Sequence, residues 1–416
     1  MIPSPLPGLA PVRIGAARLV RVRVPYTAAL GGSFGPSYQG VLLALEGQGP
    51  EGRLTGWGEA PALSARGMSA AAVEAALARA VGALAGVSVG GVMDVEARLE
   101  ALEDAEPHPS PAGEAGTSRQ AEAPAALPAP SRNALETALL DLLGRANGLS
   151  LADLLGGRRR DTVECNALVL GQRPEAVAVE VAGLRARGFT TVKLKASPLW
   201  HADPAIAVRF ELERLAAARW SGGPGLRLRL DLNCLDSDLA ELAVASLARE
   251  GLEVLEQPLP ATAGLAEWAG LAAWSASPLA ADESLADRDL APRLPDAGVG
   301  LAIKLATVGG PLAALRLARA AAAARRPVPV LLSTSMETAV GVAAAVQVAA
   351  AMEPPPLACG LDTLRFHRAA EGQGGGRGEA RSGGLDWSGA HVEVPGGPGL
   401  GMAPSGADIA RWTARD

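Results

Sequence analysis

The amino-acid sequence predicts an α/β fold: a TIM barrel joined to a smaller α+β domain. Two observations support this prediction. Between residues 163 and 361, short apolar runs alternate with Ala- and Leu-rich helical segments, which is typical of βα units and a parallel sheet. Charged residues stand at the ends of five of these runs, which read TTVKLK, LRLRLDLN, LEVLEQP, LAADES and LAIKLA. In a TIM barrel, the C-terminal ends of the strands carry the active site.

The composition is compatible with a barrel and an additional domain. The chain has 416 residues, and 49% of them are hydrophobic. Its formal net charge of −6 comes without a basic cluster, which argues against a nucleic-acid partner. The three cysteines (Cys165, Cys234 and Cys359) have no metal-binding spacing, and an odd number is a poor disulfide framework. The sequence also lacks a long apolar run and a secretory signal pattern, so we expect a cytoplasmic protein without a membrane partner.

Residues 1–155 are predicted to form the N-terminal α+β domain. Alternating patterns indicate three strands within residues 11–61, in VRIGAARLVRVRVPY, GVLLALEG and LTGWGEAP. Ala-rich helical patterns follow at 69–85, with Ser69 as the N-cap, and at 93–104.

Two stretches of this domain are not expected to form regular structure. The Gly- and Ser-rich segment at 27–38 is predicted to be a mobile loop, with a plain surface hairpin as the alternative. Residues 105–131 are rich in Pro, Ala, Gly and Glu and have no apolar period, so we expect a disordered insertion. A helix over 132–145 follows, with its leucines on one face.

Residues 156–365 are predicted to form the barrel. Strands are expected near 163–170, 190–195, 226–233, 252–256, 278–282, 300–304, 328–332 and 357–361. Helical patterns fill most of the gaps, as in PEAVAVEVAGLRARG and PAIAVRFELERLAAARW. In residues 366–416, a Gly-rich linker precedes HVEVPGGPGLGM and the short helix ADIARW, which we expect to return to the N-terminal domain.

Three carboxylates end consecutive predicted strands: Asp231, Glu256 and Asp282. Adjacent parallel strands lie roughly 4.8 Å apart, so these side chains can converge on one point. Like charges in one pocket repel each other, and a bound dication relieves that repulsion. An all-oxygen ligand set favours Mg²⁺, with Mn²⁺ as the alternative. Each acid alone could equally cap the helix that follows it, but three in succession favour a metal site.

Lysines lie on both sides of this carboxylate series. Lys193 and Lys195 are two residues apart on one strand, so both point to the same face. A lone K-x-K is more often a solvated face, but here Val192 and Leu194 supply the face toward the helices. Lys304 ends the sixth predicted strand, across the barrel. Nearby cations lower the pKa of a lysine, which suits a general base that removes a proton next to a carboxylate.

The set K-x-K, D-x-N, E-Q-P, D-E-S and I-K-L resembles the enolase superfamily, specifically its muconate-lactonizing-enzyme subgroup. GWGEAP and ALETALLDLLGRANG are similar to its capping domain and barrel entry, and VPGGPGLGM to its C-terminal return. The resemblance implies an α/β fold of a modified TIM barrel, (β/α)7β, with an α+β capping domain formed by residues 1–155 and the C-terminal return. The resemblance implies that Asp231, Glu256 and Asp282 bind Mg²⁺ and that Lys195 and Lys304 form the acid/base pair. Lys193 would then tune the pKa of Lys195, and Asn233 would support the metal ligands without binding the ion.

The end of the seventh predicted strand distinguishes the subgroups of this superfamily. The mandelate-racemase type carries a histidine there, whereas this chain has LLSTS, with Ser333 and Ser335. None of the four histidines ends a predicted strand, which leaves a Lys/Lys pair: His108, His201, His367 and His391.

The serine-rich strand end and the following LACGL resemble o-succinylbenzoate synthases, which dehydrate the cyclohexadiene carboxylate SHCHC in menaquinone biosynthesis. The resemblance makes Ser333, Ser335, Gly360 and Asp362 candidate substrate contacts, although the serines could instead cap the helix that follows. Dipeptide epimerases carry D-x-D at the eighth strand, and here Gly360 replaces the first acid. N-succinylamino-acid racemase and muconate cycloisomerase use the same pair of catalytic lysines, so both activities are left as alternatives.

We therefore expect a Mg²⁺-dependent lyase that acts on a small carboxylate. In this reaction Lys195 removes the α-proton and returns it to the departing hydroxyl, while Lys304 and the metal stabilise the enediolate. Specificity would reside in the loop at 27–38 and at the ends of strands seven and eight. The alternative from another class is a barrel that only binds a partner, which five buried charges disfavour. The sequence leaves open whether the protein forms a homo-oligomer.

Overall fold

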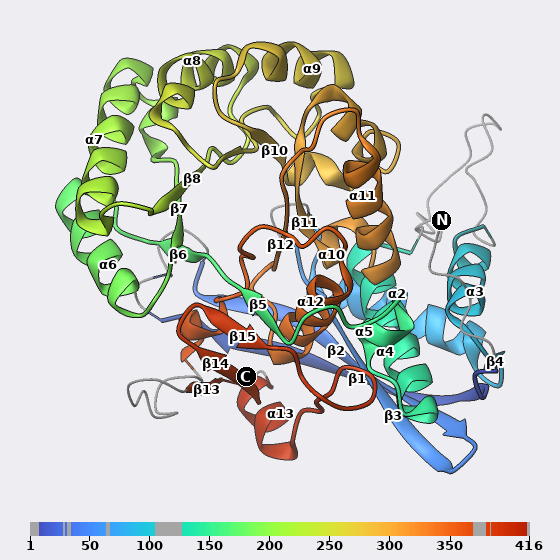
Figure 1. Ribbon diagram of the computed structural model, residues 1–416. Helices are drawn as coiled ribbons and strands as arrows, with labels where there is room; N and C mark the ends of the chain where they lie inside the picture. Colours follow the sequence, from blue (N-terminus) through green and yellow to red (C-terminus); the bar gives the residue numbers. More distant parts are fainter. Residues whose placement is uncertain are drawn as a thin grey trace, which may run out of the picture.

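The computed structural model describes residues 8–27, 30, 35–63, 67–104, 127–368, 380–382 and 384–413. Helices surround a curled parallel sheet, and a long antiparallel sheet lies beside it (Figure 1). The predicted combination of a barrel-like α/β unit and an α+β cap is confirmed. The predicted insertion at 105–131 and linker beyond 366 fall largely outside the described residues, and only a few residues of the loop at 27–38 are described.

The cap consists of an antiparallel sheet and three helices. Its strands run in the order β3-β2-β1-β4, and they are β1 (Val12–Pro25), β2 (Ser37–Gly49), β3 (Gly52–Pro61) and β4 (Ser88–Val89). The helices are α2 (Ala70–Leu84), α3 (Val92–Asp104) and α4 (Ala129–Asn147). Ser69 caps α2 as predicted, because its side chain accepts a hydrogen bond from the Ala72 backbone N–H at 3.2 Å.

Helix α4 begins three residues before the predicted start at 132, so residues 129–131 are helical and the predicted boundary of the insertion is wrong there. Pro130 lies in its first turn, where a missing N–H costs little. From Ser131 to Gly144 every residue is buried, because the helix is packed on several sides rather than on one apolar face.

The three motifs that resembled the cap, the barrel entry and the C-terminal return meet at Asp141 of α4. Its two carboxylate oxygens accept the backbone N–H of Trp57, at 2.8 Å, and that of Leu400, at 2.7 Å. The β3 backbone lies directly on α4, since a Cβ at Gly58 would come within 1.9 Å of the Ala134 carbonyl oxygen. The glycines of GWGEAP therefore permit the contact between cap sheet and helix.

The parallel sheet has seven strands in sequential order. They are β6 (Ala167–Val169), β7 (Thr191–Lys195), β8 (Arg227–Asp231), β9 (Val254–Glu256), β10 (Leu279–Ala281), β11 (Gly300–Lys304) and β12 (Val330–Ser333). The connecting helices are α6 (Pro174–Ala186), α7 (Pro204–Gly222), α8 (Ser237–Leu247), α9 (Leu265–Trp274), α10 (Leu305–Val308), α11 (Pro311–Ala323) and α12 (Ala339–Ala351). The βα alternation predicted from the sequence is thus confirmed for these seven strands.

The eighth predicted strand, at 357–361, is wrong. This segment makes only isolated bridges, from Cys359 to Cys165 and from Gly360 to Ser333, and it still joins the two edges of the sheet. Its backbone N–H groups do pair with both edges, from Leu357 and Gly360 to the carbonyls of Val330 and Leu332 and from Cys359 to that of Glu164. Each edge is bridged at a single residue, which is too short a pairing for a strand. The first predicted strand, 163–170, divides into β6 and the separate β5 (Thr162–Glu164).

The C-terminal segment contacts both parts of the molecule. β13 (Ala380–Ser382), β14 (Leu385–Ser388) and β15 (His391–Glu393) form an antiparallel sheet with β5, which follows the short helix α5 (Leu151–Leu154). The last helix, α13 (Gly406–Trp412), contacts β1 of the cap, where Thr413 bridges Val22. The predicted return to the cap is thus found for α13. The domain boundaries at 155 and 365 stay predictions.

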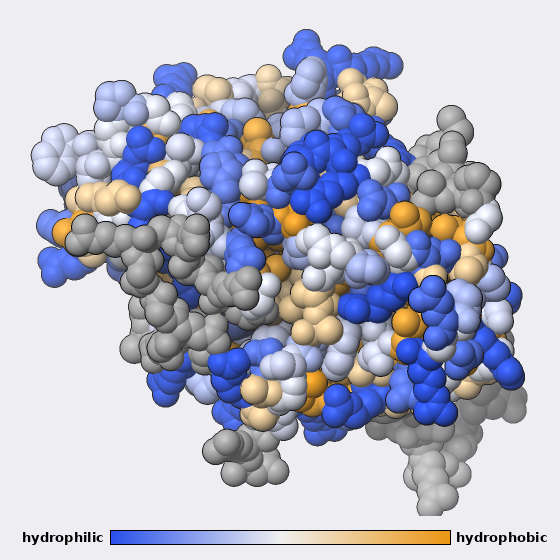
Figure 2. Space-filling view, turned by 60° about the horizontal axis from the view of Figure 1, so that its bottom comes forward, coloured by the Kyte–Doolittle hydropathy of each residue, from blue (hydrophilic) through white to orange (hydrophobic). Residues whose placement is uncertain are grey.

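The surface in Figure 2 is mostly hydrophilic, with hydrophobic residues scattered rather than gathered in one large patch. In the parts of the chain that the structure describes, no helix combines the length and apolar character needed to cross a membrane. The cytoplasmic location and a homo-oligomeric state stay predictions.

Candidate active site

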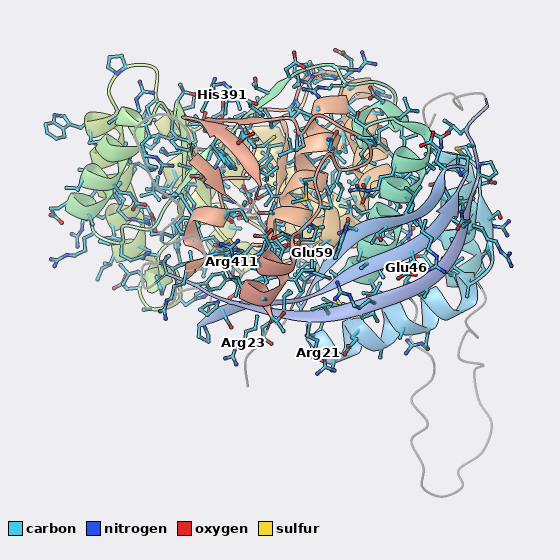
Figure 3. All side chains as sticks on the ribbon, turned by 90° about the horizontal axis from the view of Figure 1, so that it is seen from below. Arg21, Arg23, Glu46, Glu59, His391 and Arg411 are labelled. Carbon is cyan, nitrogen blue, oxygen red and sulfur yellow. The ribbon has the colours of Figure 1, made fainter. Side chains whose placement is uncertain are left out.

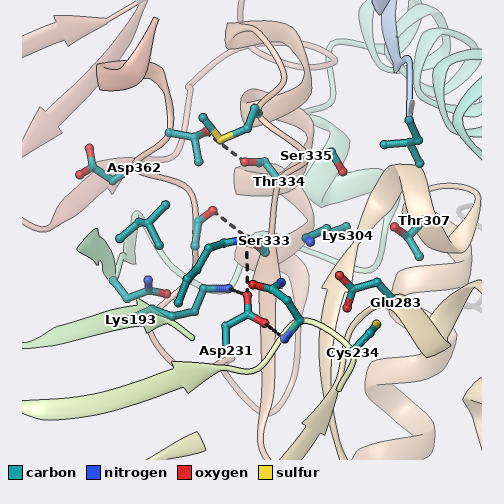
Figure 4. A pocket seen from close by; sticks show the side chains of 18 of the residues that line it. Lys193, Asp231, Cys234, Glu283, Lys304, Thr307, Ser333, Thr334, Ser335 and Asp362 are labelled. Carbon is teal, nitrogen blue, oxygen red and sulfur yellow. Dashed lines mark hydrogen bonds and ion pairs between the residues drawn. The ribbon is translucent and has the colours of Figure 1, made fainter. Parts of the chain in front are cut away.

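A cavity of about 610 Å³ opens at the C-terminal ends of the barrel strands (Figure 4). Most of its wall comes from the strand ends and the loops that follow them, and the cap contributes Tyr26, Ala62 and Leu63. Nine of the eleven predicted site residues line it: Lys193, Lys195, Asp231, Asn233, Lys304, Ser333, Ser335, Gly360 and Asp362. The other two, Glu256 and Asp282, lie behind the wall and contact the lining lysines. The cavity therefore lies where a barrel enzyme carries its active site.

The three predicted metal ligands end adjacent strands as expected. Asp231 is paired in register with Glu256 across β8 and β9, and Asp282 directly follows β10. Each is at most 1% exposed. Asn233 lies two residues beyond Asp231 and its backbone N–H donates to Asp231 Oδ1 at 3.1 Å, while its φ of 50° turns the chain away from the strand. The sequence spacing thus brings these carboxylates to one edge of the sheet.

The lysines contact these carboxylates directly. Lys193 Nζ donates to Asp231 Oδ2 at 3.0 Å and to Glu256 Oε1 at 2.9 Å. Lys304 Nζ lies 2.5 Å from Asp282 Oδ2, on the other side of the series. Lys195 Nζ is farther away, 3.9 Å from Asp231 Oδ2. The chain has only three lysines in all, and each of them is in this pocket.

The surroundings divide the lysines into two kinds. Burial disfavours the ammonium form of Lys193, but Asp231, Glu256 and Asp282 outweigh it and raise its pKa. Burial also opposes the charge of Lys304, and its carboxylate neighbours again raise the pKa.

Lys195 differs from both of these lysines. Burial lowers its pKa, and the charges of Lys193 and Lys304 lower it further, against the opposing effect of Asp231. Lys195 is therefore the lysine most readily converted to a neutral amine, which is the form that a general base needs.

Replacing Lys193 with alanine should raise the pKa of Lys195. The substitution removes a positive charge that disfavours the Lys195 ammonium, and it deprives Asp231 of the partner at 3.0 Å that partly neutralises it. Both changes favour protonated Lys195, so the rising limb of the pH–rate profile should move up by about one pH unit. Lysine labelled with ¹³C at Cε would follow the titration directly, since only three side-chain signals arise in the intact protein. An unchanged Lys195 titration would contradict the coupling.

Oxygen atoms of the carboxylate series are available to a cation. Burial raises the pKa of Glu256, whereas Lys193, Lys195 and Lys304 overcome the burial of Asp231 and lower its pKa to about 2. Two buried oxygens, Glu256 Oε2 and an Asp282 oxygen (Oδ1), receive no hydrogen bond.

Buried carboxylate oxygens without a donor fit a hard, oxygen-preferring ion such as Mg²⁺. In the described residues, no group of three or more His, Cys, Asp and Glu side chains is arranged to hold an ion as it stands, and Lys193 bridges two of the carboxylates. Loading would therefore require Lys193 or the carboxylates to shift.

Glu283 is a pocket residue that the sequence reasoning missed. It directly follows Asp282, begins a short 3₁₀ helix (Glu283–Ala286) and lines the cavity. Burial, with Asp282 and Asp231 nearby, raises its pKa to about 7. The only sequence signal was the second acid of LAADES. Other missed lining residues have no polar motif around them. Thr307 lies in α10, and the others, in segments between elements, include Tyr26, Asn166, Cys234 and Thr363.

The predicted substrate contacts lie at the end of β12 and on the closing segment that follows α12. Ser333 pairs in register with Lys304, and its Oγ lies 3.4 Å from the Gly360 carbonyl oxygen. A Cβ at Gly360 would come within 2.7 Å of that Oγ, so a larger residue there would force the Ser333 hydroxyl to move. The alternative that the serines cap the next helix is wrong, because Thr338 caps α12. Figure 4 shows Asp362 on the far side of the pocket from Glu283.

The cap is joined to the strand-seven loop by a buried carboxylate, Glu59 of β3 (Figure 3). It accepts Tyr38 Oη at 2.7 Å, both the N–H and the hydroxyl of Thr338 at 2.9 and 2.8 Å, and the N–H of Gly341 at 2.9 Å. The loop from Ser333 to Thr338 is thereby fixed against the cap. Burial nevertheless raises the pKa of Glu59.

Comparisons with known proteins support this picture. Residues 176–408 match the family described as enolase C-terminal domain-like. The o-succinylbenzoate synthase of Thermobifida fusca is 38% identical over 213 residues, 50% of this chain and 62% of that protein. Muconate cycloisomerase 1-1 of Acinetobacter lwoffii is 30% identical over 288 residues, 68% of this chain and 70% of that protein. The first match thus spans less than two thirds of the relative.

Solved structures agree on the fold. The L-Ala-D/L-Glu epimerase from Bacillus subtilis superposes with a TM-score of 0.74 and 26% identity, over 93% of this chain and 98% of that one. Muconate lactonizing enzyme from Pseudomonas putida gives a TM-score of 0.75 and 22% identity, over 97% and 100%. The family match, the seven-stranded sheet and the ordered strand-end motifs lead to one conclusion: the chain belongs to the enolase superfamily.

Proposed function

We propose that the protein is a Mg²⁺-dependent enzyme that removes a proton next to a carboxylate, and that its reaction is the dehydration of SHCHC catalysed by o-succinylbenzoate synthases. One observation carries the proposal: Lys195, whose pKa is lowered, shares a buried cavity with Lys304 and a series of carboxylates. The relatives named o-succinylbenzoate synthase and muconate cycloisomerase support the general chemistry.

The metal would be held by Asp231, Glu256 and Asp282. When bound, it supplies positive charge that stabilises the substrate carboxylate as negative charge develops on it. Lys304 is protonated in its surroundings and adds a second positive charge. Lys193 keeps Lys195 poised as a neutral amine, in accord with the electrostatics described above.

In the proposed dehydration, the Lys195 amine takes the α-proton of SHCHC and becomes an ammonium. The electron pair of the broken C–H bond then expels the ring hydroxyl, and Lys195 returns its proton to that group. One water leaves, Lys195 regains its amine form and the product ring is aromatic, so atoms and charges balance. No oxidant or reductant is needed.

The cavity wall supports SHCHC over a dipeptide. SHCHC carries a flat ring and a second carboxylate, which suit a small polar wall built from Ser333, Ser335 and Gly360. A dipeptide brings an ammonium whose charge must be neutralised on desolvation, and only Asp362 is available on that side among the described lining residues. N-succinylamino acids share the second carboxylate, so their racemisation is the favoured side activity.

A substrate panel tests this order. Purified protein with Mg²⁺ should receive SHCHC, N-succinylamino acids, L-dipeptides and cis,cis-muconate, and we expect SHCHC to give the highest kcat/KM. Dipeptide epimerisation above SHCHC dehydration would contradict the proposal. An absence of turnover with all four, in protein that binds Mg²⁺, would favour the barrel that only binds a partner.

A further inference from the structure

Among the described lining residues, Asp362 is the one carboxylate on the far wall of the cavity, and an arginine lies beside it. It is 8% exposed and its Oδ2 lies 2.7 Å from Nε of Arg365, three residues further along the chain. The pair is a contact between charges rather than an aligned hydrogen bond, since Oδ2 accepts no hydrogen bond. Arg365 itself is not among the residues that line the cavity.

Three further contacts hold Arg365 in place. Its Nη2 donates to the Leu168 carbonyl at 2.8 Å, and its Nε lies 3.3 Å from the Asp362 carbonyl oxygen. Its guanidinium also lies over the Phe366 ring, 4.2 Å from the centroid. An arginine stays charged at all ordinary pH values, so a fixed positive charge lies directly behind the Asp362 carboxylate.

The pairing determines which charge the far wall can accept. An unpaired buried carboxylate would bind an ammonium strongly, whereas a carboxylate beside a guanidinium is already neutralised. Burial raises the pKa of Asp362, and the positive charges of Arg365 and Arg187 oppose that rise, so a second positive charge lies in the vicinity. The net charge on this side of the cavity is therefore not negative.

We propose that Arg365 is a specificity-determining residue: by neutralising Asp362, it excludes substrates with a distal ammonium and admits those whose distal group is neutral or a carboxylate. This inference rests on the proposed function, because it assumes that the reacting carboxylate of the substrate lies at the Asp231 side. The charge of the distal group thus defines the substrate class, and the residue that selects this charge lies outside the cavity wall.

Three ligands that differ only at the distal end test it: glycyl-L-phenylalanine with an ammonium, N-acetyl-L-phenylalanine without charge and N-succinyl-L-phenylalanine with a carboxylate. α-Proton exchange in D₂O measures the reaction, and the rise in Tm on adding each ligand with Mg²⁺ measures binding without turnover. The intact protein should favour the succinyl and acetyl ligands over the glycyl one.

Charge variants then separate pairing from folding. The quantity to compare is the rate of α-proton exchange with the glycyl ligand divided by the rate with the acetyl ligand. Arg365→Met should raise this glycyl-to-acetyl ratio about tenfold or more, because Asp362 becomes an unpaired acid. The double variant Asp362→Asn/Arg365→Met should show no such increase in the ratio. Arg365→Lys should prefer the three ligands in the same order as the intact protein. If Arg365→Met does not fold, Asp362→Asn alone gives the reverse test, since the remaining guanidinium should lower the ratio further.

The two proposals fail in different ways. A glycyl-to-acetyl ratio that is unchanged in folded Arg365→Met and in Asp362→Asn would overturn the role of Arg365. Ligand binding that follows the charge order without any proton exchange would leave that role intact and overturn the proposed reaction.

Discussion

Lys195→Ala is expected to lower kcat about a thousandfold or more while the protein stays folded. A positioned general base contributes typically about 10²–10⁴ in rate, and the other two lysines of the chain are held as ammonium ions by their carboxylate neighbours. Neither can therefore replace the lost amine. The measurement is steady-state kinetics with SHCHC, together with thermal unfolding to show that the barrel is intact.

Arginine variants distinguish a base from a positive charge. Lys195→Arg keeps the charge but cannot lose its proton, so it should be as inactive as Lys195→Ala. Lys304→Ala should also lose about 10²–10³ in kcat, but Lys304→Arg should recover part of it, because Lys304 acts through its charge beside Asp282. Rates near those of the intact protein in Lys195→Ala would remove the base assignment, and equal losses in both Lys304 variants would contradict an electrostatic role.

Most of the fold could be predicted because the βα alternation leaves a strong pattern. Each of the seven strands is a short apolar run, and the edge that carries the charges is fixed by the parallel arrangement. The closing segment at 357–361 was mispredicted for a local reason. Its apolar composition resembles a strand, but the segment bridges each of its two neighbours at a single residue only.

The placement of the carboxylates and lysines could also be predicted, whereas the wall that surrounds them could not. Asp231 and Glu256 are brought together by strand register, which follows from spacing alone. Tyr26 reaches the cavity from the cap, and Glu59 contacts Thr338 almost 280 positions further along the chain. Such contacts depend on how two domains pack, and no local pattern encodes them.

The pairing of Asp362 illustrates the same limit within one loop. The sequence correctly singled out Asp362 as a lining residue, and Arg365 stands only three positions later. Whether an arginine three residues away folds back onto the acid or extends to solvent depends on the short 3₁₀ turn at Leu364–Phe366. The charge of the wall therefore became visible only with the side chains in place.

Removing the metal is expected to abolish activity, and adding Mg²⁺ should restore it. The pocket gathers three buried carboxylates, and two of their oxygens have no hydrogen-bond donor, so the ion satisfies groups that are otherwise costly to bury. Binding should also stabilise the fold, by about 2.7 kcal/mol when Mg²⁺ exceeds its Kd a hundredfold. A rise in Tm with Mg²⁺ therefore measures binding independently of turnover.

Substitutions assign that binding to residues. Glu256→Gln and Asp231→Asn should each weaken the Mg²⁺-dependent rise in Tm, because a neutral amide binds a hard cation less strongly than a carboxylate. Asp362→Asn is the matched control: it removes a carboxylate from the same cavity but on the far wall, so the response to Mg²⁺ should be unchanged. Full activity after chelation, or equal weakening by Asp362→Asn, would mean that the carboxylates at the strand ends do not hold the ion.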